Sequence, residues 1–249
     1  MQQQMGRKVC AVLIFVLTLS LCAWVPAQTS SSAQNQKKMQ EATRKASRAA
    51  KVFNDIMSTP DHAIPRELLE KAEAVAVFPG LIKAAFIVGG QGGSGVISRR
   101  EPQGWSAPVF FKAGGGSVGL QIGASATDLV LLFMNDNALK NLMEDRFEIG
   151  GEASAAAGPV GRTVSASTDA QLQAGILSYS RSKGLFAGVD VKGVVISPDD
   201  DDNRAVYGMK AHDILTGAQQ IEMRRLPAGV RIFPQTLARY SVRRRTRNR

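Results

Sequence analysis

Residues Ala84 to Gly95 read AAFIVGGQGGSG, an apolar run that passes directly into a glycine-rich stretch. Gly90, Gly92 and Gly95 form the pattern G-x-G-x-x-G, which in dinucleotide-binding folds lies between a strand and a helix. The residues that follow are Val-Ile-Ser, and Pro102 comes shortly after them. Because a helix able to hold a pyrophosphate does not fit there, we predict a strand–turn–strand unit that binds no nucleotide.

The same texture continues along most of the chain. Short apolar or alternating runs are separated by glycine, proline and polar residues, a pattern typical of β-strands joined by tight turns. Strands are expected at 75–78, 84–88, 96–98, 108–112, 117–122 and 128–134, and, richer in small residues, at 152–164, 170–179 and 188–196. Small side chains permit close backbone approach and strong curvature of a sheet.

Helical periodicity precedes these strands. Between Lys37 and Pro60, apolar residues recur three and four positions apart and therefore share one helix face. These residues are Met39, Ala42, Ala46, Ala49, Phe53 and Ile56. Shorter helices are expected at 65–72 and within 137–145. The predicted fold class is α+β: N-terminal helices packed on one strongly twisted, glycine-rich, mostly antiparallel sheet that curves towards a barrel.

Residues 1–27 have the features of a secretory signal peptide. Arg7 and Lys8 form a basic start, an uncharged apolar run follows, and Val-Pro-Ala precedes Gln28 as a cleavage site. We therefore expect export to the periplasm or the medium. A retained anchor and a lipoprotein attached through Cys22 remain as alternatives. Both cysteines, Cys10 and Cys22, lie in this leader, so the mature chain is expected to have no disulfide or cysteine metal site.

The net charge of +10 does not describe the chain evenly. Nine arginines and no acid lie between Arg224 and Arg249, whereas residues 28–223 are nearly neutral. We expect a polar linker at 28–36, a domain at 37–223 and a basic tail at 224–249. Such a tail would suit an anionic surface, or would be simply solvated, and export argues against nucleic acid.

The predicted helix carries the first candidate binding residues. A basic amphipathic helix can hold lipid phosphates with its cations while its apolar face enters the acyl boundary. The cations are Lys37, Lys38, Arg44, Lys45, Arg48 and Lys51. Lys38 and Lys45 flank the apolar face and are better placed than Arg44 or Arg48. The alternative is a solvated face on a helix that packs against its own domain.

A second candidate lies near the end of the strand series. Arg181 and Lys183, beside hydroxyls and Gly184, could hold a phosphate, or could form a solvated turn. Residues 199–203 read Asp-Asp-Asp-Asp-Asn but lack the ligand spacing of a calcium loop, so we expect an acidic surface turn.

Catalytic and metal signals are weak. Ser117 lies in a G-x-S-x-G pattern, yet the residues after it favour a strand, whereas a nucleophile elbow needs a helix. His62 and His212 have no metal-ligand partner at helical spacing. We predict no catalytic residue, no metal and no cofactor.

Several motifs, taken in order, resemble the SYLF domain family. They are FPG at 78–80, VGGQGGSGV at 88–96, GWSAP at 104–108, GGSVGLQIG at 115–123, AGPVGR at 157–162 and SYSRSKGLFAG at 178–188. The similarity extends over about 38–216. It implies a lipid-binding domain without catalysis, some eukaryotic members of which bind phosphoinositides and actin.

Together with the leader, this resemblance implies a non-enzymatic protein of the bacterial envelope. Basic residues would hold anionic head groups at a membrane surface. The alternative is a structural envelope protein that binds a protein partner or a polyanion without lipid specificity. A hydrolase that uses Ser117 is the third possibility.

Overall fold

The computed structural model of the 249-residue chain describes residues 28–59, 63–86, 88–117, 123–144, 146–151, 154–161, 174–182, 184–189, 191 and 193–241. The chain divides into two compact units, 1–37 and 38–249. The helices are α2 (Gln28–Met57), α3 (Arg66–Lys71), α4 (Asp136–Asn141), α6 (Asp200–Tyr207), α7 (Ala211–Thr216) and α8 (Ala228–Tyr240), with a 3₁₀ turn at Met223–Arg225.

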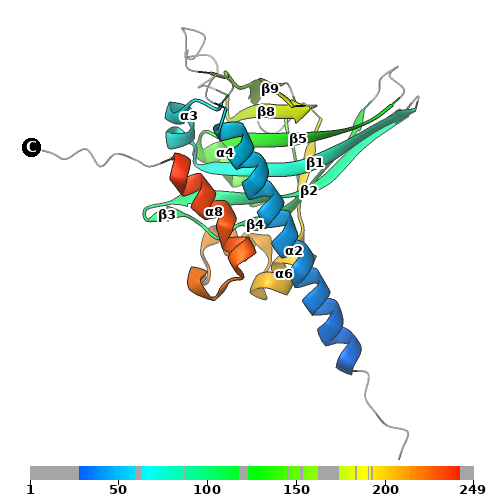
Figure 1. Cartoon of the computed structure of the whole chain (residues 1–249), viewed down its shortest axis with the longest axis vertical. Coiled ribbons are helices and arrows are strands. Elements are labelled where there is room, and N and C mark those ends of the chain that lie inside the picture. Colours follow the sequence, from blue (N-terminus) through cyan, green and yellow to red (C-terminus); the bar gives the residue numbers. More distant parts are fainter. Residues whose placement is uncertain are drawn as a thin grey trace, which may run out of the picture. The chain divides into compact units, whose positions relative to one another are not determined.

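The strands are β1 (Ala74–Phe86), β2 (Val88–Glu101), β3 (Gly104–Trp105), β4 (Val109–Ser117), β5 (Gly123–Phe133), β6 (Phe147–Glu148), β7 (Ala155–Ala157), β8 (Ile176–Ser182), β9 (Leu185–Gly188) and β10 (Val195–Pro198). They form one sheet in the order β6-β10-β4-β2-β1-β5-β8-β7, with β3 beside β2 and β9 beside β8. Among these pairs, only β7–β8 is parallel. The sheet curls strongly into half of a barrel (Figure 1), which confirms the predicted α+β class.

The glycine-rich stretch lies inside a strand rather than in a turn. β1 and β2 form one long hairpin whose register runs from Phe86↔Val88 to Ala74↔Arg99. Gly90, Gly92 and Gly95 are all within β2, which continues as a strand to Glu101. The prediction of strand–turn–strand is therefore correct for the unit but wrong for the place of the glycines.

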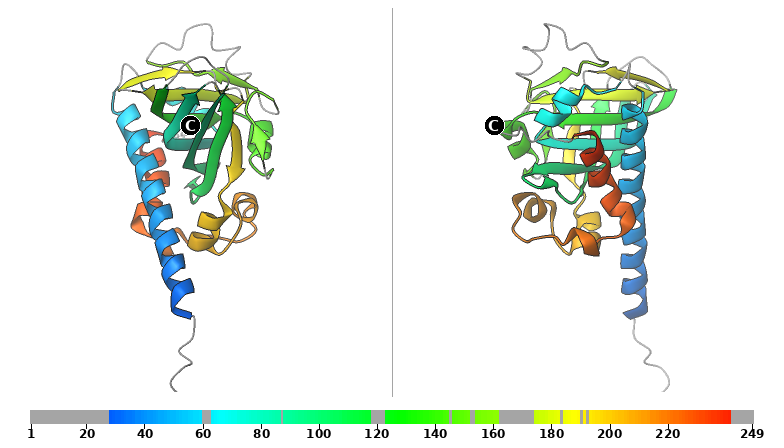
Figure 2. Two further views of the ribbon diagram at one scale, coloured as in Figure 1. Left: turned by 90° about the vertical axis from the view of Figure 1, so that its right-hand side faces the viewer. Right: turned by 60° about the vertical axis from the view of Figure 1, so that its left-hand side comes forward.

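Two apolar cores lie on opposite faces of the sheet, because alternate residues of a strand point to opposite sides. On one face, α2, α3 and α8 pack over Val75, Val96 and Phe110. On the other, α4 and α7 pack around residues such as Phe78 and Phe111. α2 and α8 lie side by side (Figure 2), and the Ser47 hydroxyl donates to the carbonyl oxygen of Gly229 at 3.0 Å.

Three local expectations are corrected by the structure. The segment 28–36 is helical, and it contains no glycine or proline to interrupt a helix. The basic segment is not a free tail from Arg224 onward, because α8 buries Val230, Phe233 and Leu237 in the domain. Residues 199–203 are not a surface turn: they open α6, where aspartates at the first turn interact favourably with the helix dipole.

Candidate functional site

The apolar face of α2 is buried against the sheet of its own domain. Ala42, Ala46, Ala49 and Phe53 are fully buried and Ile56 is nearly so, in the core that α2 forms with the sheet. Among the side chains of α2 that the structure describes, no exposed apolar stripe remains that could enter a bilayer. The helix is packed against its own domain, as the sequence-based alternative foresaw, and any contact with a surface must come from its outer side.

Two of the predicted cations of α2 pair with aspartates at the start of α6. Lys45 Nζ donates to Asp199 Oδ2 at 3.1 Å and to Asp202 Oδ2 at 2.6 Å, and both aspartates are buried. Lys38 pairs with the exposed Asp201 at 3.1 Å. The flank that the sequence favoured for lipid contact thus joins α2 to the start of α6.

The electrostatics of this joint follow from burial and pairing. Burial works against the charge of Lys45, but its hydrogen bonds to Asp202 and Asp199 outweigh that effect and raise the pKa of the ammonium group. Burial also raises the pKa of the Asp202 carboxyl, although Lys45 opposes the shift. Asp199 is shared, because its other oxygen accepts from Lys112 of β4 at 3.0 Å. The joint is therefore a closed ionic network rather than an open anion site.

The outer side of α2 keeps two arginines available. Arg44 and Arg48, one turn apart, are exposed, and within the described residues no carboxylate lies at ion-pair distance from either. Lys51 is exposed but pairs with Asp55 at 2.8 Å, four residues along the helix. Lys37 is exposed at the end of the first unit. We refer to Arg44 and Arg48 as the arginine pair of α2.

Arg181 has a structural role in this geometry. Its guanidinium contacts Asp128 of β5 at 2.7 Å and Asp55 of α2 at 3.4 Å, while Asp128 accepts from the backbone N–H of Gly80 at 2.9 Å. The hydrogen bond from Lys51, with that from Arg181, lowers the pKa of Asp55. Arg181 therefore ties α2 to three strands, and Lys183 lies outside the described residues.

The other sequence candidates form no reactive constellation in the described part of the chain. Ser117 is the last residue of β4, and the next described element is another strand. The His212 ring lies 3.3 Å from the carbonyl oxygen of Met143, and His62 is outside the described residues. In the part of the chain that the structure describes, no cluster of metal-ligand side chains occurs. Nor does any described helix combine the length and apolarity needed to cross a membrane.

A hollow that the sequence did not reveal lies on β4, β6 and β10. It has a volume of about 540 Å³, and Lys112, Arg146 and Ser197 are among the residues that line it. These residues are far apart in the sequence and only the order β6-β10-β4 brings them together. A basic residue, a hydroxyl and a glycine run give no sequence signal when they are separated in this way.

Comparison with known proteins identifies the family. A family model described as "Ysc84: Las17-binding protein actin regulator" matches residues 114–240, from the end of β4 to the end of α8. The chain is 34% identical over 185 residues to "SH3 domain-containing YSC84-like protein 1" of Rattus norvegicus, covering 72% of this chain and 54% of that protein. The human protein of the same name gives the same figures.

A yeast relative agrees with this result. "LAS seventeen-binding protein 3" of Saccharomyces cerevisiae strain S288c is 36% identical over 177 residues, covering 68% of this chain and 38% of that protein. The chain thus spans about half or less of the length of these relatives. The family model also covers α8, which lies in the segment expected to be a basic tail. With the sequence motifs and the curled sheet, these similarities show that the chain belongs to the Ysc84 family, which is the SYLF domain family.

Proposed function

We propose that this chain is an exported, non-enzymatic binding protein of the bacterial envelope that attaches to anionic phospholipid surfaces through the arginine pair of α2. Family membership supports a binding domain, and the signal-like residues 1–27 support export to the periplasm or the medium. The carrying observation is that Arg44 and Arg48 are exposed without an acidic partner among the described residues.

The mode of attachment follows from the burial of α2. Because its apolar face already packs on the sheet, the helix contributes cations and no inserted side chains. Peripheral contact of this kind depends on the surface potential of the lipid, and each cation near an anionic surface contributes about 1 kcal/mol. Binding should therefore weaken as salt rises, since the Debye length shortens to about 8 Å at physiological ionic strength.

Flotation with vesicles tests this proposal. The protein is purified from cells that express the full chain, its mass shows whether residues 1–27 were removed, and vesicles contain graded phosphatidylglycerol in phosphatidylcholine. Replacing Arg44 and Arg48 together by Gln should lower the partition coefficient about tenfold or more. Arg66→Gln, at an exposed arginine of α3, is the matched control and should float as the wild type does.

A protein partner is the second candidate. The description of the family and the name of the yeast relative both refer to binding a protein, Las17. Here Leu185 of β9 is 80% exposed, beside a small hollow that Ile56 and Phe186 help to line. Wild-type protein that fails to float on fully anionic vesicles at low salt would contradict lipid attachment and favour this alternative.

A further inference from the structure

The hollow on β4, β6 and β10 has a floor of bare backbone. Gly114 pairs with Val195 of β10, which in turn pairs with Glu148 of β6. Ala113 is buried in the core, so its neighbours Lys112 and Gly114 face the opposite side, where the hollow lies. With no side chain at Gly114, a ligand can approach the main chain of the sheet directly.

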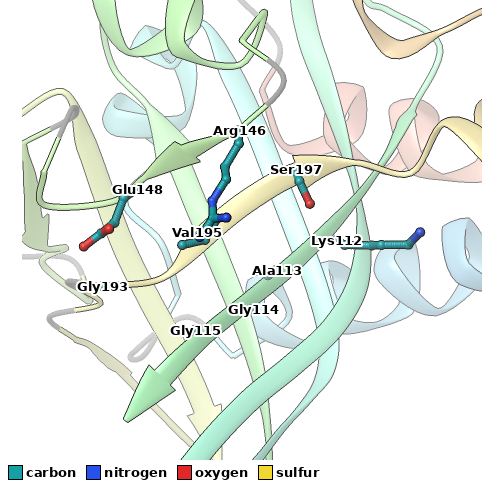
Figure 3. Close-up of a pocket in the computed structure, with 9 residues that line it drawn as sticks. All are labelled: Lys112, Ala113, Gly114, Gly115, Arg146, Glu148, Gly193, Val195 and Ser197. Atoms are coloured by element: carbon teal, nitrogen blue, oxygen red, sulfur yellow. The ribbon is translucent and has the colours of Figure 1, made fainter. Parts of the chain in front are cut away.

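Polar side chains rise around this floor. Arg146 and Glu148 come from β6 and the residue before it, Ser197 from β10 and Lys112 from β4. Figure 3 shows Arg146 extending across β10 near Val195, whereas Glu148 points away from it. Ser197 and Lys112 lie at the other end of the hollow. These two residues lie directly opposite each other in the sheet, because Ser197 of β10 pairs with Lys112 of β4.

The charge balance favours an anion. Arg146 is exposed, and no carboxylate among the described residues lies at ion-pair distance from it. Lys112 pairs with Asp199, but its side chain is 54% exposed and an ammonium group has three donors. Glu148, the acid in the lining, is engaged in an interaction of its own. A guanidinium, an ammonium and a hydroxyl are thus available to one ligand.

We propose that this hollow binds a small phosphate ester whose phosphate group is held by Arg146, while Ser197 and Lys112, at the other end of the hollow, hydrogen-bond to the rest of the molecule. The guanidinium fork matches phosphate geometry with two parallel hydrogen bonds. The volume of about 540 Å³ lies within the range of small-molecule sites and exceeds the needs of a bare phosphate. The phosphate belongs to a lipid head group or to a free ester, and the lipid case rests on the proposed function.

The test begins in solution, without membranes. Binding of glycerol 3-phosphate and of inorganic phosphate to the purified full-chain product is measured by calorimetry. Saturable binding that Arg146→Gln weakens by about tenfold, as expected for loss of a charge-assisted contact, supports the proposal. Arg66→Gln should bind as the wild type does. Both arginines are exposed, so neither change should unfold the protein, and thermal unfolding checks this.

Failure of the site is distinguishable from failure of surface attachment. The proposal is overturned if wild type shows no saturable binding up to about 10 mM, which is ten times a dissociation constant of about 1 mM and would therefore reveal even weak binding. It is equally overturned if Arg146→Gln binds as tightly as wild type. Both outcomes are read without vesicles and do not depend on Arg44 or Arg48.

The vesicle arm then separates the two sources of phosphate. If Arg146→Gln loses both glycerol 3-phosphate and phosphatidylglycerol flotation, the ligand is a lipid head group. If it loses only the soluble ester, the ligand is a free phosphate ester. A second variant, Gly114→Leu, replaces no cation, places a side chain on the floor of the hollow and should reproduce the loss in solution.

Discussion

The four long strands β5, β1, β2 and β4 differ sharply between their two halves. In the covered half, the face under α2 and α8 presents Val75, Val96, Phe110 and Leu132, all fully buried. Further along the same strands and on the same face lies a second half, called here the glycine half. It presents Ile82, Gly90, Gly92, Gly114 and Ala126.

The backbone does not cause this difference. The antiparallel register continues through both halves, with one irregularity near Gly80, where φ is 61°. A side chain at Gly90 or Gly92 would meet nothing within 4 Å, and neither residue has a positive φ. Folding therefore gives no reason for glycine at these two positions, although glycine weakens a strand interior. We therefore expect the covered half to contribute most of the stability. The residues of the glycine half would then be determined by what binds to its surface rather than by folding.

Ionic contacts mark the border between the halves. Lys112, two residues before Gly114, meets Asp199 and through it Lys45. Asp128, two residues after Ala126, meets Arg181. Ion pairs thus lie along the edge of the region that the helices cover. Substitutions in the covered half, at this border and in the glycine half should therefore change the free energy of unfolding by different amounts.

The largest loss is expected within the cover. Phe53→Ala should lower the free energy of unfolding by about 3–5 kcal/mol, because the ring is fully buried between α2 and the sheet and its removal leaves a cavity. Ile82→Ala, in the glycine half, should cost under about 0.5 kcal/mol, since the side chain is 57% exposed. Urea unfolding measures both, and equal losses would contradict the comparison.

The border should respond next. Lys45→Met should cost about 3 kcal/mol at pH 7, because it leaves Asp199 and Asp202 buried without their shared ammonium. Lys38→Met is the control, and its cost should stay below about 1 kcal/mol because Asp201 is exposed.

The pH dependence of that loss has a definite sign. Burial already raises the pKa of Asp202 above its ordinary value, and removal of Lys45 raises it further. A carboxyl with a raised folded pKa favours folding in its protonated form and opposes folding as pH rises through that range. The deficit of Lys45→Met should therefore shrink between pH 7 and pH 5. A deficit that grows in acid would show that the aspartates are not the cause.

Sequence patterns predicted the covered half well. The spacing of Ala42, Ala46, Ala49 and Phe53 placed the buried face of α2 correctly, because period-3.6 burial is a local property. Val230, Phe233 and Leu237 carry a similar pattern in α8, but the arginines around them suggested a tail instead. The high arginine content led to the prediction of a tail, whereas the spacing of the apolar residues would have predicted the helix.

The border and the hollow could not be predicted in the same way. Lys45 was expected to face a membrane, yet its partners lie more than 150 positions away in α6 and its N-cap. Arg146 and Gly114 become neighbours only through the pairing of β4 and β6 with β10. Long-range partners of a charge depend on sheet topology, which no local spacing in one sequence specifies.

A smaller effect is expected at the other border contact. Asp55→Asn should cost about 0.5–1 kcal/mol, because the carboxylate is about one-third exposed and its ion pairs are screened. Lys51 and Arg181 lower the pKa of Asp55, so this contribution is present above the ordinary value of 3.8 and is lost as pH falls through the lowered value. The difference between wild type and Asp55→Asn should therefore stay constant from pH 8 to pH 5 and disappear in stronger acid. Denaturant unfolding at each pH measures this. A difference in the free energy of unfolding that persisted in acid would contradict the prediction.

The smallest effect is expected in the glycine half. Gly92→Val should leave the free energy of unfolding within about 0.5 kcal/mol of wild type, or raise it, because its Cβ meets open space and valine favours strands. Gly95→Ala is the matched control in the same strand. Its Cβ would approach the Val77 carbonyl oxygen and the Phe78 ring, so it should cost about 1–3 kcal/mol despite its smaller side chain. If urea unfolding instead ranks Gly92→Val as the more damaging change, the glycine half is covered in solution. If Gly92→Val leaves the stability unchanged, folding does not require glycine at this position. The glycine would then be explained by the binding of a ligand or partner to this surface.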